Sequence, residues 1–249
     1  MLILLPPSET KRPGGRRSAL HLDALALPQL TPQRTQVIDA LVALAADEDE
    51  SARVLKLSAR QRGDIAHNAA LRTAETLPAV DRYTGVLYDA LGAETMDAAA
   101  RRWIGGHVFI HSAPFGPVGA LDAIPAYRLA AGTTLPGLPP LRRIWADAVT
   151  AALVEAAPTF VLDLRSEAYA ALGPVPAHVP QAYLRVVAEG PDGARRALNH
   201  FNKHAKGDLV RRLATERPRI GSVAGLRRWA DAAGVTLRHG KPGELDLVV

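Results

Sequence analysis

The residues best placed to do chemistry lie in the stretch Asn199–Arg212, which concentrates lysine, histidine and arginine. At about 100° per residue, the apolar side chains of this stretch share one side of a helix, and Lys206 falls near the middle of that side. An ammonium group on a core-facing stripe is costly unless an anion meets it. Two interpretations stay open: Lys206 snorkels or pairs with a core carboxylate, or it forms the cationic wall of a cleft.

Two further residues bear on these interpretations. Gly207 costs about 1 kcal/mol in a helix interior, yet it removes a side chain beside Lys206, so we expect another backbone or a ligand to approach there. Asp163, near the end of a predicted buried strand at 160–164, is the expected anion for Lys206. A desolvated lysine can lose its proton and act as base or nucleophile, so Lys206 and Asp163 are the catalytic candidates.

Other polar residues follow predicted strands or begin predicted helices, which is where open sheets place ligand-contacting groups. Thr84 is expected to be the N-cap of an apolar helix. Either the amides at that helix start bind an anion, or Thr84 caps the helix and has no further role. Ser166 is expected to cap the helix at 167–172. The loop after Met1–Leu5 lacks the spacing of a P-loop, and it contacts a ligand or only caps its own turn. The expected anion or ligand site comprises Ser8, Lys11, Thr84, Ser112, Tyr127, Arg128, Ser166, Lys203 and Lys206.

No metal site or cofactor is expected. His107 and His111 are four residues apart, but on the predicted strand at 107–111 they would lie roughly 13 Å apart and could not share an ion. The chain has no cysteine, which excludes disulfides, thiol catalysis, thiolate zinc sites and iron–sulfur clusters.

The positive charge is unevenly distributed. The net charge is +5, but residues 195–228 contribute +8, which leaves −3 for the rest. A second basic segment lies between Arg53 and Arg72. Such segments are typical of proteins that bind a polyanionic partner. The alternative is a solvated arginine surface, and we prefer this alternative for Arg217, Arg219, Arg227 and Arg228. The expected DNA-contacting residues are Arg53, Lys56, Arg60, Arg62, Arg211 and Arg212.

The pattern of apolar residues predicts a single α+β domain over residues 1–249, with a mixed sheet surrounded by helices. No apolar run approaches the roughly 20 residues of a membrane span, and the N-terminus lacks the features of a signal peptide, so we expect a cytoplasmic monomer. The expected strands are 1–5, 107–111, 160–164, 183–188, 196–201, 235–239 and 244–249, with a turn at 190–193. The expected helices are 34–46, 51–57, 58–76, 95–104, 141–157, 167–172, 203–212 and 222–233.

Several of these stretches together resemble the YaaA family of bacterial peroxide-stress proteins. The matching segments are LILLPPSETK at 2–11, YTGVLY at 83–88, Ser112 with Phe115 and Gly116, Leu121 with Asp122, Pro125, Tyr127–Leu129, Trp145, Asp163 with Ser166 and Tyr169, and KHAKG at 203–207. The first loop reads PPSETK where other members have SPAKT, which indicates an actinobacterial branch.

The resemblance implies a YaaA-type fold with a basic cleft, a helix-hairpin-helix element associated with DNA, and a role in limiting free iron and oxidative DNA damage. The best candidate for that element is 53–72, where Gly63 stands alone instead of a glycine–apolar–glycine hairpin. Non-specific DNA binding is one hypothesis. An enzyme or binding protein for a small anionic or nucleotide-like ligand is another, and direct iron binding ranks last because ligand spacing is missing. The ligand hypothesis requires the first loop and the 203–212 helix to meet across a shared hollow.

Overall fold

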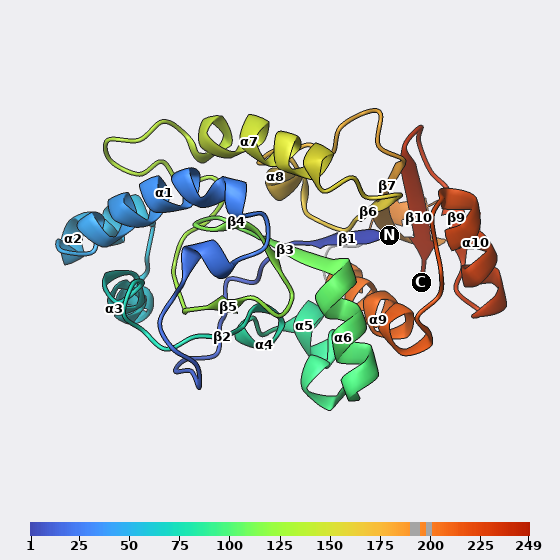
Figure 1. The fold of residues 1–249 in the computed structure, drawn as a ribbon, viewed down its shortest axis with the longest axis horizontal. Coiled ribbons are helices and arrows are strands. Elements are labelled where there is room, and N and C mark those ends of the chain that lie inside the picture. Colours follow the sequence, from blue (N-terminus) through green and yellow to red (C-terminus); the bar gives the residue numbers. More distant parts are fainter. Residues whose placement is uncertain (190–194, 198–200) are drawn as a thin grey trace.

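A mixed β-sheet forms the centre of the molecule in the computed structural model, which describes residues 1–189, 195–197 and 201–249 (Figure 1). Among the described strands, eight form one sheet in the order β4-β3-β1-β6-β7-β10-β9, with β8 paired to β7. Neighbours from β3 to β10 along this order are parallel, whereas β4, β8 and β9 are antiparallel to their partners. The bounds are β1 (Leu2–Leu5), β3 (Val108–Ser112), β4 (Gly116–Gly119), β6 (Val161–Asp163), β7 (Gln181–Glu189), β8 (Arg195–Ala197), β9 (Leu237–His239) and β10 (Glu244–Val248).

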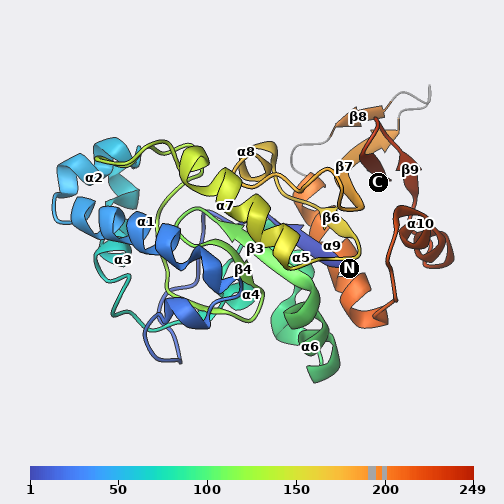
Figure 2. The ribbon, with the colours of Figure 1, turned by 45° about the horizontal axis from the view of Figure 1, so that its top comes forward.

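Helices cover both sides of this sheet. Helices α1, α7 and α8 lie on one side, and α5, α6 and α9 lie on the other (Figures 1 and 2). The bounds are α1 (Thr31–Leu44), α2 (Glu48–Val54), α3 (Ile65–Ala69), α4 (Ala79–Arg82), α5 (Val86–Leu91), α6 (Ala98–His107), α7 (Leu141–Glu155), α8 (Glu167–Ala170), α9 (Phe201–Glu216) and α10 (Val223–Ala232). Short 3₁₀ turns lie at Leu22–Ala24, Pro28–Leu30, Ala59–Asp64 and Ala93–Thr95, and a small ribbon pairs β2 (Leu77–Pro78) with β5 (Ala123–Ile124). Within the described residues, no helix is long and apolar enough to cross a membrane.

The central strands form where the sequence is continuously apolar. All four residues of β1 are buried, because β1 has a partner on each side and helices on both faces. In α7, which forms within the helix predicted at 141–157, Leu141, Trp145 and Val149 repeat at helical spacing and are buried. The α+β class and the mixed sheet are therefore confirmed, and they form one compact domain.

The single helix predicted at 58–76 is wrong. The segment forms a 3₁₀ turn and then α3. At Thr76 the backbone is no longer helical and forms a β-bridge with Arg17. The Thr76 hydroxyl also donates to the Ser18 carbonyl at 2.8 Å. Tertiary pairing with the first loop thus overrides the helical pattern. Part of the predicted strand at 196–201 and the turn at 190–193 lie outside the described residues, and α9 begins at Phe201.

The close packing of α9 on α5 depends on Gly207. A Cβ atom added to Gly207 would lie 2.1 Å from the carbonyl oxygen of Leu87 and 2.9 Å from the Ala90 side chain. The approach expected beside Lys206 is therefore made by the backbone of α5. This contact is where α9 meets the helix that follows the YTGVLY segment.

We predict that Gly207→Ala destabilises the protein by about 1–3 kcal/mol, because the added methyl group forces α5 and α9 apart. Gly106→Ala in α6 is the matched control, since a Cβ there meets nothing within 4 Å. That control should be neutral or stabilising by up to about 1 kcal/mol. Urea unfolding of both variants checks the pair, and equal midpoints would contradict the packing.

Candidate functional site

The candidate site is the edge of the sheet at which the parallel strands β1, β3 and β6 end. Parallel strands bring their carboxyl ends to one edge, and open sheets bind ligands there. Ser8 follows β1, Ser112 ends β3, and Asp163 ends β6 with residues 164–166 directly after it. The register pairs Leu4 with Asp163, and Leu5 with Ile110, so these segments leave the sheet at neighbouring positions.

Lys206 reaches this edge from α9. The side chain is nearly covered, with the residue 6 % exposed, and its Nζ donates to the Leu164 carbonyl at 3.0 Å. Burial lowers the pKa of Lys206 to about 8, while the charge of Asp163 opposes that shift. The helical periodicity therefore placed this ammonium group correctly on the core-facing side.

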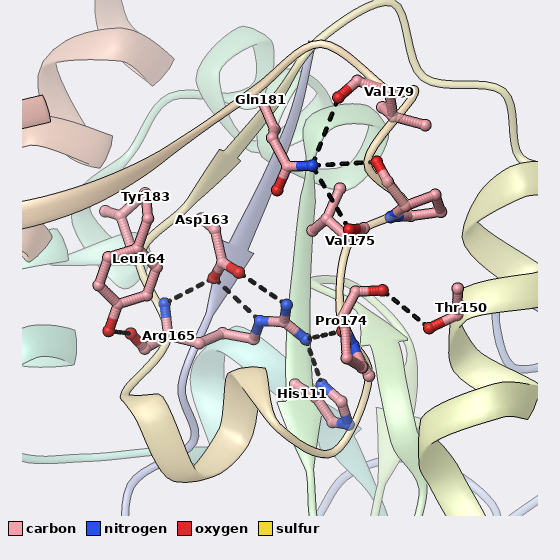
Figure 3. Close-up of polar contacts among 12 residues, drawn as sticks. His111, Thr150, Asp163, Leu164, Arg165, Pro174, Val175, Val179, Gln181 and Tyr183 are labelled. Atoms are coloured by element: carbon pink, nitrogen blue, oxygen red, sulfur yellow. Dashed lines mark hydrogen bonds and ion pairs between the residues drawn. The ribbon is translucent and has the colours of Figure 1, made fainter. Parts of the chain in front are cut away.

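Asp163 forms its direct ion pair with Arg165, a residue that the sequence interpretation missed (Figure 3). The carboxylate accepts from Arg165 Nε at 2.9 Å, from Nη2 at 2.7 Å and from the backbone amide at 3.0 Å. Asp163 acts on Lys206 only through its charge. The signal was present: residues i and i+2 at a strand end lie on one side, so the Asp-Leu-Arg order predicts a local pair.

Arg165 also fixes His111, which Figure 3 shows beside the guanidinium. Arg165 Nη1 donates to His111 Nδ1 at 2.8 Å and to the Gly173 carbonyl at 2.9 Å. A guanidinium group can only donate, so Nδ1 accepts and the imidazole proton is assigned to Nε2. Burial and the Arg165 charge lower the pKa of His111 well below its ordinary value. Nε2 is buried and has no hydrogen-bond partner within the described residues, so His111 is a neutral donor at this edge.

The first loop folds over a second lysine, Lys11. Its Nζ donates to the carbonyls of Ser8 at 3.0 Å and Glu9 at 3.2 Å, and it lies 4.0 Å from the centroid of the Tyr127 ring. Burial, followed by the charge of Arg128, lowers the pKa of Lys11 to about 7. Arg128 itself pairs with Glu9 at 3.2 Å. Lys11, Tyr127 and Arg128 are therefore brought together, as the proposed site requires.

Phenol groups line this second lysine. The hydroxyl groups of Tyr83 and Tyr127 lie 2.8 Å apart, and Tyr88 donates to the Pro6 carbonyl at 2.7 Å. Burial raises the pKa of all three phenols well above the ordinary value, so each stays protonated at neutral pH. The site thus gathers neutral hydroxyl donors around a lysine.

Thr84 is not the N-cap of α5, contrary to the prediction. Gly85 occupies that position with φ +96°, and its amide donates to Asp89 at 3.2 Å. The Thr84 amide donates to the Thr10 carbonyl, and the Thr10 hydroxyl donates back to the Thr84 carbonyl, each at 3.2 Å. Thr84 therefore anchors the first loop, and the start of this short helix is already occupied by protein partners.

Ser112, Ser166 and Lys203 stand in three different settings. Ser112 donates to the Gly116 carbonyl and accepts from the Phe115 amide, which fixes the turn between β3 and β4. Ser166 is exposed and makes no side-chain cap to α8, which corrects the predicted cap. Lys203 is exposed, one helical turn before Lys206. Their part in ligand binding stays a prediction.

Lys206 and the first loop are connected through α5. That helix packs on Gly207 of α9, and its N-cap, Gly85, lies against Thr10 and Ser8: a Cβ there would meet their hydroxyl oxygens at 3.3 and 3.5 Å. Two segments far apart in the sequence thus share one helix between them. The hollow and the basic cleft expected between them stay predictions.

Most of the expected DNA-contacting residues make contacts within the protein. Arg53 pairs with Glu50, Arg62 with Asp49, and Arg212 with Asp208. Arg211 donates to the carbonyls of Leu91 and Gly92, which end α5, whereas Lys56 and Arg60 are exposed. Helices α2 and α3 lie at one end of the molecule and α9 toward the other (Figure 1), so these residues form separate surfaces. The helix-hairpin-helix element stays a prediction.

Known proteins similar to this chain come from bacteria. A family model described as "Peroxide stress protein YaaA" matches residues 1–238. A UPF0246 protein of Corynebacterium efficiens is 44% identical over 256 residues, covering 100% of both chains. A UPF0246 protein of Streptomyces coelicolor is 42% identical over 259 residues, covering 100% of this chain and 98% of its own length. A UPF0246 protein of Corynebacterium glutamicum is 40% identical over 243 residues, covering 96% and 95%.

Removing the carboxylate at the sheet edge tests its structural importance. We predict that Asp163→Asn destabilises the protein by about 3–5 kcal/mol, because it leaves the buried Arg165 guanidinium without a counter-ion. Asp208→Asn is the control, since its exposed pair with Arg212 is worth about 1 kcal/mol or less. Denaturant unfolding measures both, and similar losses in the two variants would contradict the assignment.

The two lysines, Lys206 buried and Lys11 partly buried, should titrate at unusually low pH. Because burial disfavours the charged amine, we expect NMR midpoints of about 7 for Lys11 and about 8 for Lys206. Each signal is assigned by its loss in the Lys→Arg variant. The pKa of each lysine is lower in the folded state than in the unfolded state, so the unfolded chain binds more protons above these midpoints. The free energy of unfolding should therefore increase as pH rises through them. Titration midpoints near 10.5 for both lysines would contradict the desolvated environment that the structure gives them.

Proposed function

This chain belongs to the YaaA family of peroxide stress proteins, and we propose that it acts in the peroxide response by binding a small anionic or nucleotide-like ligand at the carboxyl edge of its sheet. In this way it limits free iron and the oxidative DNA damage that follows. The observation that supports the proposal best is the buried Lys206 ammonium, held by a backbone carbonyl.

The charges at this edge favour an anion. Asp163 accepts two side-chain hydrogen bonds from Arg165, and its charge also acts on Lys206. One negative charge therefore has to balance two positive charges. A buried positive charge without a full counter-ion is costly, and an anionic ligand would remove that cost. Lys11 and Arg128 extend the positive character along the first loop, where Glu9 pairs with Arg128 and the charges of Glu9 and Asp64 act on Lys11.

The same groups suit proton transfer. An amine whose pKa is about 7 or 8 exists in both forms near neutrality, so it binds an anion as a cation and accepts a proton as a base. Around Lys11 stand Tyr83 and Tyr127, whose phenols stay protonated and so add no charge to the site. If the protein is an enzyme, Lys206 is the proposed base.

Non-specific DNA binding is the second candidate. It is supported by the net charge of +5 and by the exposed Lys56, Arg60 and Lys203. Arg53, Arg62 and Arg212 would first have to leave their carboxylate partners, which weakens their attraction for phosphate. The geometry therefore favours the ligand hypothesis.

One survival experiment separates the two candidates. In a bacterial host lacking its own YaaA relative, we expect Lys206→Met to abolish peroxide protection while the Tm stays equal or rises, because removing a poorly compensated buried charge does not weaken the fold. Lys241→Met, on an exposed hairpin, and the Lys56→Ala/Arg60→Ala double variant should keep protection.

The opposite pattern would replace the ligand hypothesis with DNA binding. In that case the double variant loses protection and also loses affinity for duplex DNA at about 50 mM salt, while Lys206→Met protects normally. Marked unfolding of Lys206→Met would show that its ammonium is structural.

A further inference from the structure

A cavity lies at the opposite edge of the sheet, where β1 begins. Its volume is about 520 Å³, within the range of roughly 300–1,000 Å³ common for ligand pockets. Met1 lines this cavity, whereas Ser8 of the candidate site follows the other end of β1, so the two places are separated by the length of the strand. Its lining comes from α6 and from the segment that follows α9, and these two helices lie side by side (Figure 1). Its lining residues are Met1, Trp103, His107, Arg217, Pro218, Arg219, Ile220 and Gly221.

One wall of the cavity is a stack of two flat rings. Trp103 and His107 are one turn apart on α6, and their rings lie 4.3 Å apart with an interplanar angle of 5°. His107 Nδ1 lies 2.8 Å from the Trp103 carbonyl, so it donates there, and Nε2 is the nitrogen left to face a ligand. Trp103 is only 9 % exposed while His107 is half-buried, so the imidazole is the ring that a ligand meets first.

The opposite wall is cationic. Arg217 and Arg219 are exposed, and neither has an ion-pair partner in the part of the chain that the structure describes. The cavity lining includes no acidic side chain among those residues. The charge of Arg217 acts on Asp97, but the pKa of that carboxyl is lowered first by the Ala100 amide, then by the Ala99 amide, and only after them by Arg217. From the sequence we expected Arg217 and Arg219 to belong to a solvated surface, and nothing in the sequence indicated a cavity beside them.

Arg217 holds an unfavourable backbone conformation. It follows the last turn of α9 with φ +52°, and its amide donates to the Leu213 carbonyl at 2.8 Å. Glycine is the usual residue at such a helix end, because a side chain is strained there. A strained residue kept at a cavity is a reason to look for function in its side chain.

We propose that this cavity binds a nucleoside phosphate, with the base on the His107–Trp103 stack and the phosphate between Arg217 and Arg219. Base–aromatic stacking tolerates any flat ring, and guanidinium groups match phosphate oxygens in a bidentate manner. Neither half of the cavity suffices alone: the stack selects a planar ring and the arginines select an anion. This site is independent of the lysine-lined edge.

Calorimetry with AMP, adenosine and inorganic phosphate tests the proposal on the full chain. AMP should bind, and adenosine and phosphate should each bind at least about 10-fold more weakly. Arg217→Gly is the decisive variant, because it removes the guanidinium group and relieves the strained backbone. It should weaken AMP binding by about 10-fold or more while raising the Tm by about 2–4 °C. Arg219→Ala should weaken binding similarly.

Arg102→Ala is the matched control, since Arg102 is an exposed arginine of α6 that does not line the cavity. Its affinity for AMP should equal that of the wild type. A 5′-phosphorylated single-stranded hexanucleotide distinguishes a free nucleotide from a nucleic-acid end, and we expect it to compete weakly. Failure to detect AMP binding, equal losses in Arg102→Ala and Arg217→Gly, or tight binding of the hexanucleotide alone would each overturn the proposal.

Discussion

The ion pair between Asp163 and Arg165 is the interaction on which the sheet edge depends. A guanidinium group buried without a counter-ion would cost several kcal/mol, so this pair decides where the chain can go after β6. Arg165 then uses its remaining donors on His111 and the Gly173 carbonyl, which fixes the end of β3 and the segment after α8. Leu164 lies between the two paired residues, and its carbonyl accepts from Lys206.

Two other buried arginines use the same chemistry elsewhere in the fold. Arg34 donates to the carbonyls of Phe115 and Pro117, and so holds the turn after β3 against α1. Arg82 donates to the carbonyls of Ile124, Glu75 and Arg12, which joins the small ribbon to the first loop. A planar group with five donors satisfies several loop carbonyls at once, so irregular backbone can be buried here.

Sequence patterns predicted the features that depend on periodicity, but they did not predict contacts in which a side chain pairs with a backbone atom. Helical spacing correctly placed Lys206 on the buried side, and apolar runs located β1, β6 and α7. The partner of Lys206 is a carbonyl, which every residue has, so no pattern of side chains could identify it. Likewise, Thr84 looked like a cap because Gly85 has no side chain to signal its positive φ. The helix at 58–76 failed because pairing with the first loop, a long-range effect, decides the structure there.

The lysine-lined edge is built entirely from amines, guanidinium groups, phenols, hydroxyls, an imidazole and carboxylates, in a chain that contains no thiol. Hydrogen peroxide attacks sulfur first, taking cysteine to sulfenic and higher acids and methionine to its sulfoxide. The two methionines, Met1 and Met96, lie outside this edge. The groups proposed to do the work therefore survive the oxidant under which the family acts, without any repair by reductases.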